Sequence, residues 1–223
     1  MRRFVNPFLS ALRYPLAAAM LVCLVPAFLL DIAVVKSCLN SFLLLWFFLP
    51  LMIVVVVWFL IPGLNGSFLA ILEHELTHML FAVLTGHKPG SIAVHQGRGG
   101  SFAFEGKGNW LIFLSPYFFP TFAFAVMLAG GVYHLWDAPL PKLYWSVLGV
   151  MSGYHIASNI MEIHPKQTDF KKAGYLFSFL FLPSANLIAW GVLFMYARFG
   201  WPGIGLYFSK LAGMTGAFIQ QFA

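Results

Sequence analysis

Two histidines and a glutamate stand together as His-Glu-Leu-Thr-His at residues 74–78, inside an apolar run from Ser67 to Leu84. If this run is a helix, His74 and His78 share one face, because residues four apart lie one above the other. Two neutral imidazoles at that spacing can bind one Zn²⁺, and Glu75 beside them can take a proton from a zinc-bound water. The spacing therefore predicts His74 and His78 as metal ligands and Glu75 as a catalytic base.

The surroundings of this motif strengthen the prediction. Ionisable side chains inside an apolar segment are costly and need a partner such as a metal ion, and Glu73 adds one more to the group. The alternative is a polar cluster that faces water or a cavity at a helix end and binds nothing.

Composition defines the class of protein. Hydrophobic residues make up 61% of the 223 residues and charged residues only 9%, whereas a soluble domain carries about 25% charged residues. The net charge of +6 suits a protein that faces anionic headgroups, and no stretch interleaves basic and aromatic residues as nucleic-acid binding would require. Cys23 and Cys38 are too few for a zinc knuckle or a disulfide framework.

Several apolar runs approach or reach the ~20 residues that cross a bilayer. They cover residues 15–35, 42–61, 67–84, 110–136, 143–161 and 173–197, and an amphipathic tail follows at 201–223. We therefore predict an all-α polytopic membrane protein with about six transmembrane helices. Residues 1–66 are expected to form N-terminal transmembrane helices, 67–170 the core with the motif, and 171–223 a C-terminal helix and tail, all in one structural unit.

A different pattern follows the motif run. In Ser91–Gln96 and Ser101–Gly106, side chains of different character alternate along the chain, as they do in a strand with two different faces. The glycine-rich segment Gly97–Gly100 separates the two stretches. This pattern favours a small β-hairpin over a floppy loop, and we expect it to pack over the cleft because lipid does not tolerate exposed strands. Pro116 and Pro120 predict a kinked or broken, re-entrant helix in the next run.

A catalytic zinc site needs a third protein ligand. If the apolar runs alternate across the membrane, the end of the motif run, the hairpin and the polar connector Glu162–Asp169 share one side. Asp169 is our preferred ligand in this connector. Glu162 and His164 are its rivals, and spacing alone does not separate the three.

The run before this connector has a polar stripe. His155 and Asn159 follow helical spacing. Lipid would not solvate them, so they are expected to face the interior of the bundle.

Taken together, Ser67 to Phe170 resembles the site-2 protease family of intramembrane zinc metalloproteases. The resemblance rests on the membrane-embedded motif, the glycine-rich hairpin after it, and an Asn followed by a Pro and an Asp, here Asn159, Pro165 and Asp169. It implies that His74 and His78 bind zinc with Asp169 as third ligand.

The same resemblance implies a function. Glu75 would activate a zinc-bound water for peptide hydrolysis within the bilayer, and Asn159 would hold substrate or the oxyanion, with His155 as a further candidate. A hairpin edge that includes Gly99 and Phe102 would capture an unwound transmembrane substrate as an added strand. The expected cofactor is Zn²⁺, the partners are a transmembrane protein and the lipid bilayer but no nucleic acid, and the location is a membrane such as the bacterial cytoplasmic membrane. Rival functions are a non-catalytic scaffold and a metal-handling transporter.

The distribution of basic residues leaves the orientation open. Arg2, Arg3 and Arg13 place the N-terminus in the cytoplasm by the positive-inside rule. Six alternating spans then put the hairpin, with Lys88 and Lys107, on the opposite side, whereas the resemblance favours the hairpin in the cytoplasm. Either one of the first two runs does not fully cross, or the N-terminus lies outside.

Overall fold

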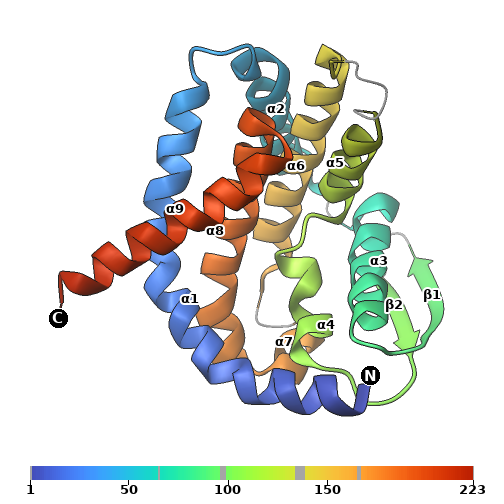
Figure 1. Cartoon of the computed structure of the whole chain (residues 1–223). Helices are drawn as coiled ribbons and strands as arrows, with labels where there is room; N and C mark the ends of the chain where they lie inside the picture. Colours follow the sequence, from blue (N-terminus) through green and yellow to red (C-terminus); the bar gives the residue numbers. More distant parts are fainter. Residues whose placement is uncertain (1, 65, 96–98, 134–138, 165–166, 223) are drawn as a thin grey trace.

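Apolar runs in lipid fold as helices because a helix satisfies its own backbone hydrogen bonds. The computed structural model describes residues 2–64, 66–95, 99–133, 139–164 and 167–222, which are mostly helical with one small hairpin (Figure 1). The elements in chain order are α1 (Arg2–Cys38), the π-helix η1 (Leu44–Phe48), α2 (Leu49–Leu60), the 3₁₀ turn η2 (Pro62–Leu64), α3 (Phe68–Leu84), β1 (Pro89–His95), β2 (Gly99–Phe104), α4 (Trp110–Leu114), the 3₁₀ turn η3 (Ser115–Tyr117), α5 (Thr121–Tyr133), α6 (Lys142–Glu162), α7 (Thr168–Ala173), α8 (Tyr175–Phe199) and α9 (Trp201–Gln220).

Two of the described helices are long and apolar enough to cross a membrane, namely Phe4–Cys38 within α1 and the whole of α8. A third candidate is the pair Trp110–Tyr117 and Thr121–Tyr133, whose axes differ by 82°. This bend agrees with the break that the two prolines of this run predict, although the end of the run at 134–136 lies outside the described residues. Two or three candidate spans are fewer than the six expected, because the second run folds as the short apolar helix Leu44–Leu60 and the other two expected spans fail the same test.

Close backbone contact holds α6 against η1 and α2. Gly149 and Gly153 are four residues apart on α6, and a Cβ atom added to them would overlap the carbonyl oxygens of Phe47 and Leu51, respectively. Small residues at this spacing let two helices approach closely in a membrane. Helix α6 is thereby fixed, and its C-terminal end carries Glu162 towards α3.

The predicted hairpin is present and antiparallel, with the pairs Ile92–Phe102 and Val94–Gly100 in register. Its strands begin about two residues earlier than the sequence pattern suggests, and the turn residues 96–98 lie outside the described residues. Strand β2 lies nearer to α3, with β1 on its outer side (Figure 1).

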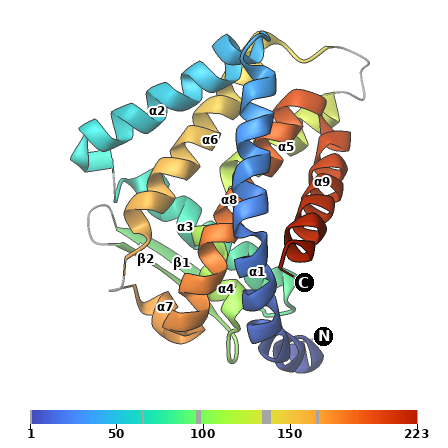
Figure 2. The ribbon, with the colours of Figure 1, turned by 90° about the vertical axis from the view of Figure 1, so that its left-hand side faces the viewer.

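The N-terminal end of α1 lies at the base of this hairpin. The side-chain amide of Asn6 donates to the carbonyl of Lys107 at 2.8 Å, and Asn109 donates to the side-chain oxygen of Asn6 at 3.0 Å. Farther along, α1 packs along α8, with α9 beside both (Figure 2). The chain therefore returns to its starting end by the time it forms the hairpin.

Candidate metal centre

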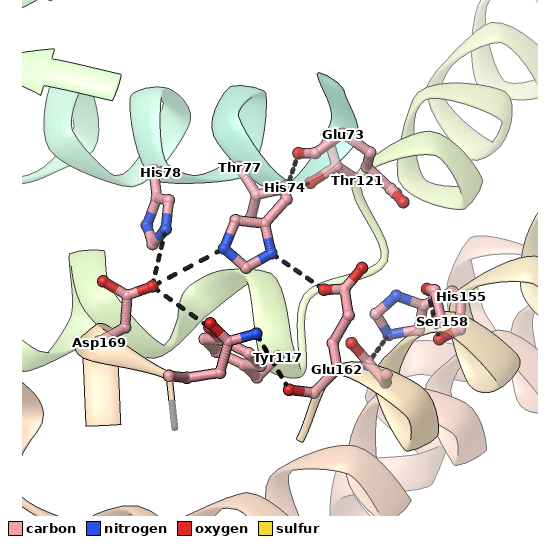
Figure 3. A network of polar contacts seen from close by, with 12 residues as sticks. Glu73, His74, Thr77, His78, Tyr117, Thr121, His155, Ser158, Glu162 and Asp169 are labelled. Atoms are coloured by element: carbon pink, nitrogen blue, oxygen red, sulfur yellow. Dashed lines mark hydrogen bonds and ion pairs between the residues drawn. The ribbon is translucent and has the colours of Figure 1, made fainter. Parts of the chain in front are cut away.

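The motif helix α3 begins at a defined cap. The side chain of Ser67 accepts a hydrogen bond from the backbone N–H of Ala70, which satisfies one of the free donors at a helix start. No glycine or proline interrupts the helix before Leu84. His74 and His78 consequently project from one face, with ring centroids 4.8 Å apart, and both rings point towards α7 (Figure 3).

Asp169 meets these two histidines from the first turn of α7. Its Oδ2 atom lies 3.8 Å from Nε2 of His74 and 3.4 Å from Nε2 of His78. One ligand atom from each of the three residues lies within 4.8 Å of the other two, so that the group could hold a metal ion. The structure thus brings together the three residues that the sequence predicted as ligands.

The hydrogen bonds on the far side of each ring show that this cluster suits a cation. Nδ1 of His78 donates to the carbonyl of Ile112 at 2.7 Å, and Nδ1 of His74 donates to the carboxylate of Glu162 at 3.0 Å. In neutral rings held this way, each Nε2 carries a lone pair that faces the Asp169 carboxylate. Three electron-pair donors that converge in a buried place favour a divalent ion between them, and two imidazoles with one carboxylate are a donor set that Zn²⁺ accepts.

The Asp169 carboxylate is itself held on both oxygens. Tyr117 donates its hydroxyl to Oδ2 at 3.2 Å, and the ammonium of Lys172 lies 3.5 Å from Oδ1. Burial raises the pKa of this carboxyl, but a proton held on Nε2 of His74 or His78, in the position that a metal ion would take, donates to it and lowers the pKa by more, well below its usual range. Asp169 is therefore ionised, as a metal ligand must be.

The two alternative ligands, Glu162 and His164, lie outside the cluster of ligand atoms. Glu162 binds the Nδ1 atom of His74, on the side of the ring away from Asp169, and so orients the ring instead of joining the three ligand atoms (Figure 3). His164 lines the neighbouring cavity but is not part of the cluster. Pro165, the middle residue of the motif comparison, lies outside the described residues.

A cavity of about 530 Å³ opens beside the cluster. Glu75 lines it together with the predicted ligands, Lys172, and Gly99 to Phe102 of β2. Among the described residues, β2 contributes to this lining and β1 does not, so the free edge of β2 faces the cavity. The predicted base and the predicted hairpin residues Gly99 and Phe102 therefore share one space with the metal cluster.

Gly100 brings β2 into direct contact with the motif helix. A Cβ atom added to it would lie 2.6 Å from Cγ2 of Ile71 and 2.7 Å from both Cγ and Oε1 of Glu75. These distances are shorter than any real Cβ contact. A larger residue at this position would require Ile71 or Glu75 to shift, so β2 packs directly against the side chain of the predicted base.

Asn159 and His155 lie away from the metal cluster. The Asn159 amide contacts Nε2 of His155 at 3.0 Å and donates to Asn186 on α8 at 3.0 Å. Asn159 lines a second cavity of about 340 Å³, between α1, α6 and α8, and not the one beside the metal cluster. As the polar stripe predicted, both residues are buried inside the bundle, but the structure does not bring them to the cluster.

Tyr117 was not identified from the sequence as a contributor to the site, whereas Glu73 was named there as part of the ionisable group. Tyr117 contacts both Asp169 and His74, and its sequence signal is its place between the two prolines of the broken run. Glu73 accepts a hydrogen bond from the backbone N–H of Phe122 at 2.8 Å, and Thr77 bonds to Thr121. Free N–H groups at the start of α5 need such partners, so Glu73 joins the motif helix to the broken span.

Comparison with known proteins assigns this arrangement to a family. The family model described as Peptidase M50B-like matches residues 49–163, about half of the chain. The match includes the motif, the hairpin and Glu162, and it ends before Asp169. Searches of curated proteins and of solved structures returned no match.

Proposed function

We propose that the chain, which belongs to the Peptidase M50B-like family, is a membrane-embedded zinc endopeptidase. This family is site-2 protease-like, which confirms the resemblance noted from the motif. Its substrates are transmembrane proteins, and it hydrolyses peptide bonds within or next to their membrane-spanning helices. The observation that carries the proposal is the convergence of two Nε2 atoms and one carboxylate oxygen within 4.8 Å beside a cavity that also contains a carboxylate base.

His74, His78 and Asp169 would hold the ion. When bound, Zn²⁺ supplies Lewis-acid chemistry, polarising a carbonyl oxygen and making water more acidic. The protein's part is to fix the ligands, and the hydrogen bonds on Nδ1 of both histidines do so before any ion binds.

Glu75 is the base in this proposal. It follows His74 directly in the helix and lines the cavity, while its side chain is held on one side by Gly100. From this position the carboxylate takes a proton from the attacking water and passes it to the amine that leaves when the C–N bond breaks. Positioned acid–base groups of this kind contribute about 10²–10⁴-fold to a rate.

The free edge of β2 provides a way to present substrate. A transmembrane helix hides its amides in its own hydrogen bonds, so it must unwind before hydrolysis. An unwound segment that pairs with β2 as an added strand would lie in the cavity, alongside Gly99 and Phe102. The register of the pairing then decides which peptide bond faces Glu75.

The test compares Glu75→Gln with the wild type in liposomes that contain a panel of tagged single-span reporter proteins. We expect Glu75→Gln to retain zinc and to lose cleavage by about 10²–10⁴-fold. Glu105→Gln is the matched control, since Glu105 is exposed on the hairpin and pairs with Lys88, and it should cleave normally. Undiminished cleavage by Glu75→Gln would refute the mechanism. Wild-type protein that binds zinc but cleaves no reporter would support the scaffold, and zinc uptake into the liposomes would support the transporter.

A further inference from the structure

Tyr117 lies directly against two of the three candidate ligands. Its hydroxyl donates to Oδ2 of Asp169 at 3.2 Å, which is the oxygen that faces both histidines. Its ring meets the His74 ring edge-on, with centroids 5.2 Å apart and planes at 86°, and packs on Phe170 at 4.7 Å. The residue is completely buried, so solvent does not compete for this hydroxyl.

The break in the helical run fixes the backbone of Tyr117. In a continuous helix its carbonyl would accept from the backbone N–H of Thr121, but that N–H bonds to Phe119 instead. The side-chain amide of Asn186 donates to the Tyr117 carbonyl at 2.8 Å, and Asn159 donates to Asn186 at 3.0 Å. Asn186 on α8 thus holds Tyr117 in place, and Asn159 on α6 holds Asn186. The buried Asn159 therefore has a role at a distance from the metal cluster.

The other oxygen of Asp169 has a much weaker partner. The ammonium of Lys172 lies 3.5 Å from Oδ1, and the Lys172 side chain is 54% exposed. An exposed ion pair is screened by water and contributes little to holding a side chain. Tyr117 therefore contacts the carboxylate from a buried position, whereas Lys172 contacts it from an exposed position in which its ammonium also lies over the Phe113 ring.

We propose that Tyr117 is a positioning residue for the metal site. Its hydroxyl fixes the Asp169 carboxylate so that Oδ2 faces the two histidines before the ion binds, and its ring limits the tilt of His74. The inference deepens the proposed function, because it rests on Asp169 serving as a metal ligand. Residues that orient metal ligands in this way typically change metal affinity by 10–100-fold when they are altered.

The test measures Zn²⁺ affinity of the purified full-length protein by competition with a chromophoric chelator. We expect Tyr117→Phe to bind Zn²⁺ about 10–100-fold more weakly than the wild type. Tyr144→Phe is the matched control, because it also loses a hydroxyl bond, to Tyr196 at 2.8 Å, but does not touch the cluster. Tyr144→Phe should bind Zn²⁺ as the wild type does.

Two further measurements separate positioning from general damage. In an Asp169→Ala background, Tyr117→Phe should cause no further loss of affinity, since its effect passes through the missing carboxylate. At saturating Zn²⁺, Tyr117→Phe should recover most of the wild-type cleavage. Unchanged affinity, an equal loss in both backgrounds, or low cleavage at saturating Zn²⁺ would each overturn the inference. A wild-type protein without Zn²⁺ affinity would instead overturn the proposed function.

Discussion

Replacing Gly100 by alanine tests whether β2 positions the base. The added Cβ would lie 2.7 Å from Cγ and Oε1 of Glu75 and 2.6 Å from Cγ2 of Ile71, whereas ordinary contacts are 3.4–4 Å. Ile71 is β-branched and stiff within a helix, so it does not turn aside. The Glu75 side chain, with its longer and more flexible stem, must give way.

The size of the effect follows from that displacement. The carboxylate has to move by about 0.7 Å or more to restore ordinary contact, and misplacing a catalytic group by ~1 Å can reduce a rate by about 10²-fold. We expect kcat/KM for Gly100→Ala to fall by about 10–100-fold, equivalent to about 1.4–2.7 kcal/mol. The overpacking itself should lower the free energy of unfolding by about 1–3 kcal/mol.

The assay measures cleavage of a single-span reporter in liposomes, Zn²⁺ affinity and thermal unfolding for the same samples. Gly213→Ala serves as the control, because a Cβ there meets nothing within 4 Å. Zn²⁺ affinity should stay unchanged in Gly100→Ala, since the three atoms nearest to the added Cβ belong to Ile71 and Glu75 and not to a ligand. Wild-type kcat/KM in Gly100→Ala would refute the idea that β2 fixes Glu75, and a loss of zinc would show that the strand acts on the ligands instead.

Three other results are expected. Glu162→Gln should weaken Zn²⁺ binding by about 10–100-fold, because His74 loses a charged partner on Nδ1; equal affinity would contradict this role. Asn159→Leu removes the amide partner of His155 and Asn186, so the free energy of unfolding should fall by about 1–3 kcal/mol and the melting temperature should drop. A lower kcat without any loss of stability would instead support the predicted oxyanion role. Removing metal with a chelator should abolish cleavage, and Zn²⁺ but not Mg²⁺ should restore it, because imidazole ligands suit zinc; recovery with Mg²⁺ would argue against the site.

The sequence located the residues that lie close together in one helix. His74, Glu75 and His78 are set by helical spacing alone, and the alternating pattern after them was sufficient to predict the hairpin. Asp169 was preferred over Glu162 and His164, but spacing could not separate them. The distinction depends on which ring nitrogen each carboxylate faces, and that becomes fixed only when α6 and α7 pack against α3.

The catalytic role expected of Asn159 stays a prediction, and the structure shows only where the residue lies. Its polar stripe correctly predicted an inward face, since lipid would not solvate it. A helix face inside a bundle can nevertheless meet more than one neighbour, and the stripe does not say which. In the structure the partner is Asn186 on α8, whose place next to the broken run could not be known from local pattern.

The position of the N-terminal end of α1 bears on the orientation of the protein in the membrane. Asn6 bonds to Lys107 and Asn109, so the N-terminal end of α1 and the hairpin share one end of the molecule. Helix α2 runs away from the other end and α3 continues from it (Figure 2), so the two helices together make one return and not two crossings. Among the described residues, that end includes Arg2, Arg3, Arg13, Lys88, Lys107, Lys171 and Lys172, whereas the ends of α1 and α8, the start of α6 and the middle of α9 carry Lys36, Arg198, Lys142 and Lys210. We infer from the positive-inside rule that the hairpin end faces the cytoplasm, and the N-terminal arginines and the hairpin lysines then obey the same rule.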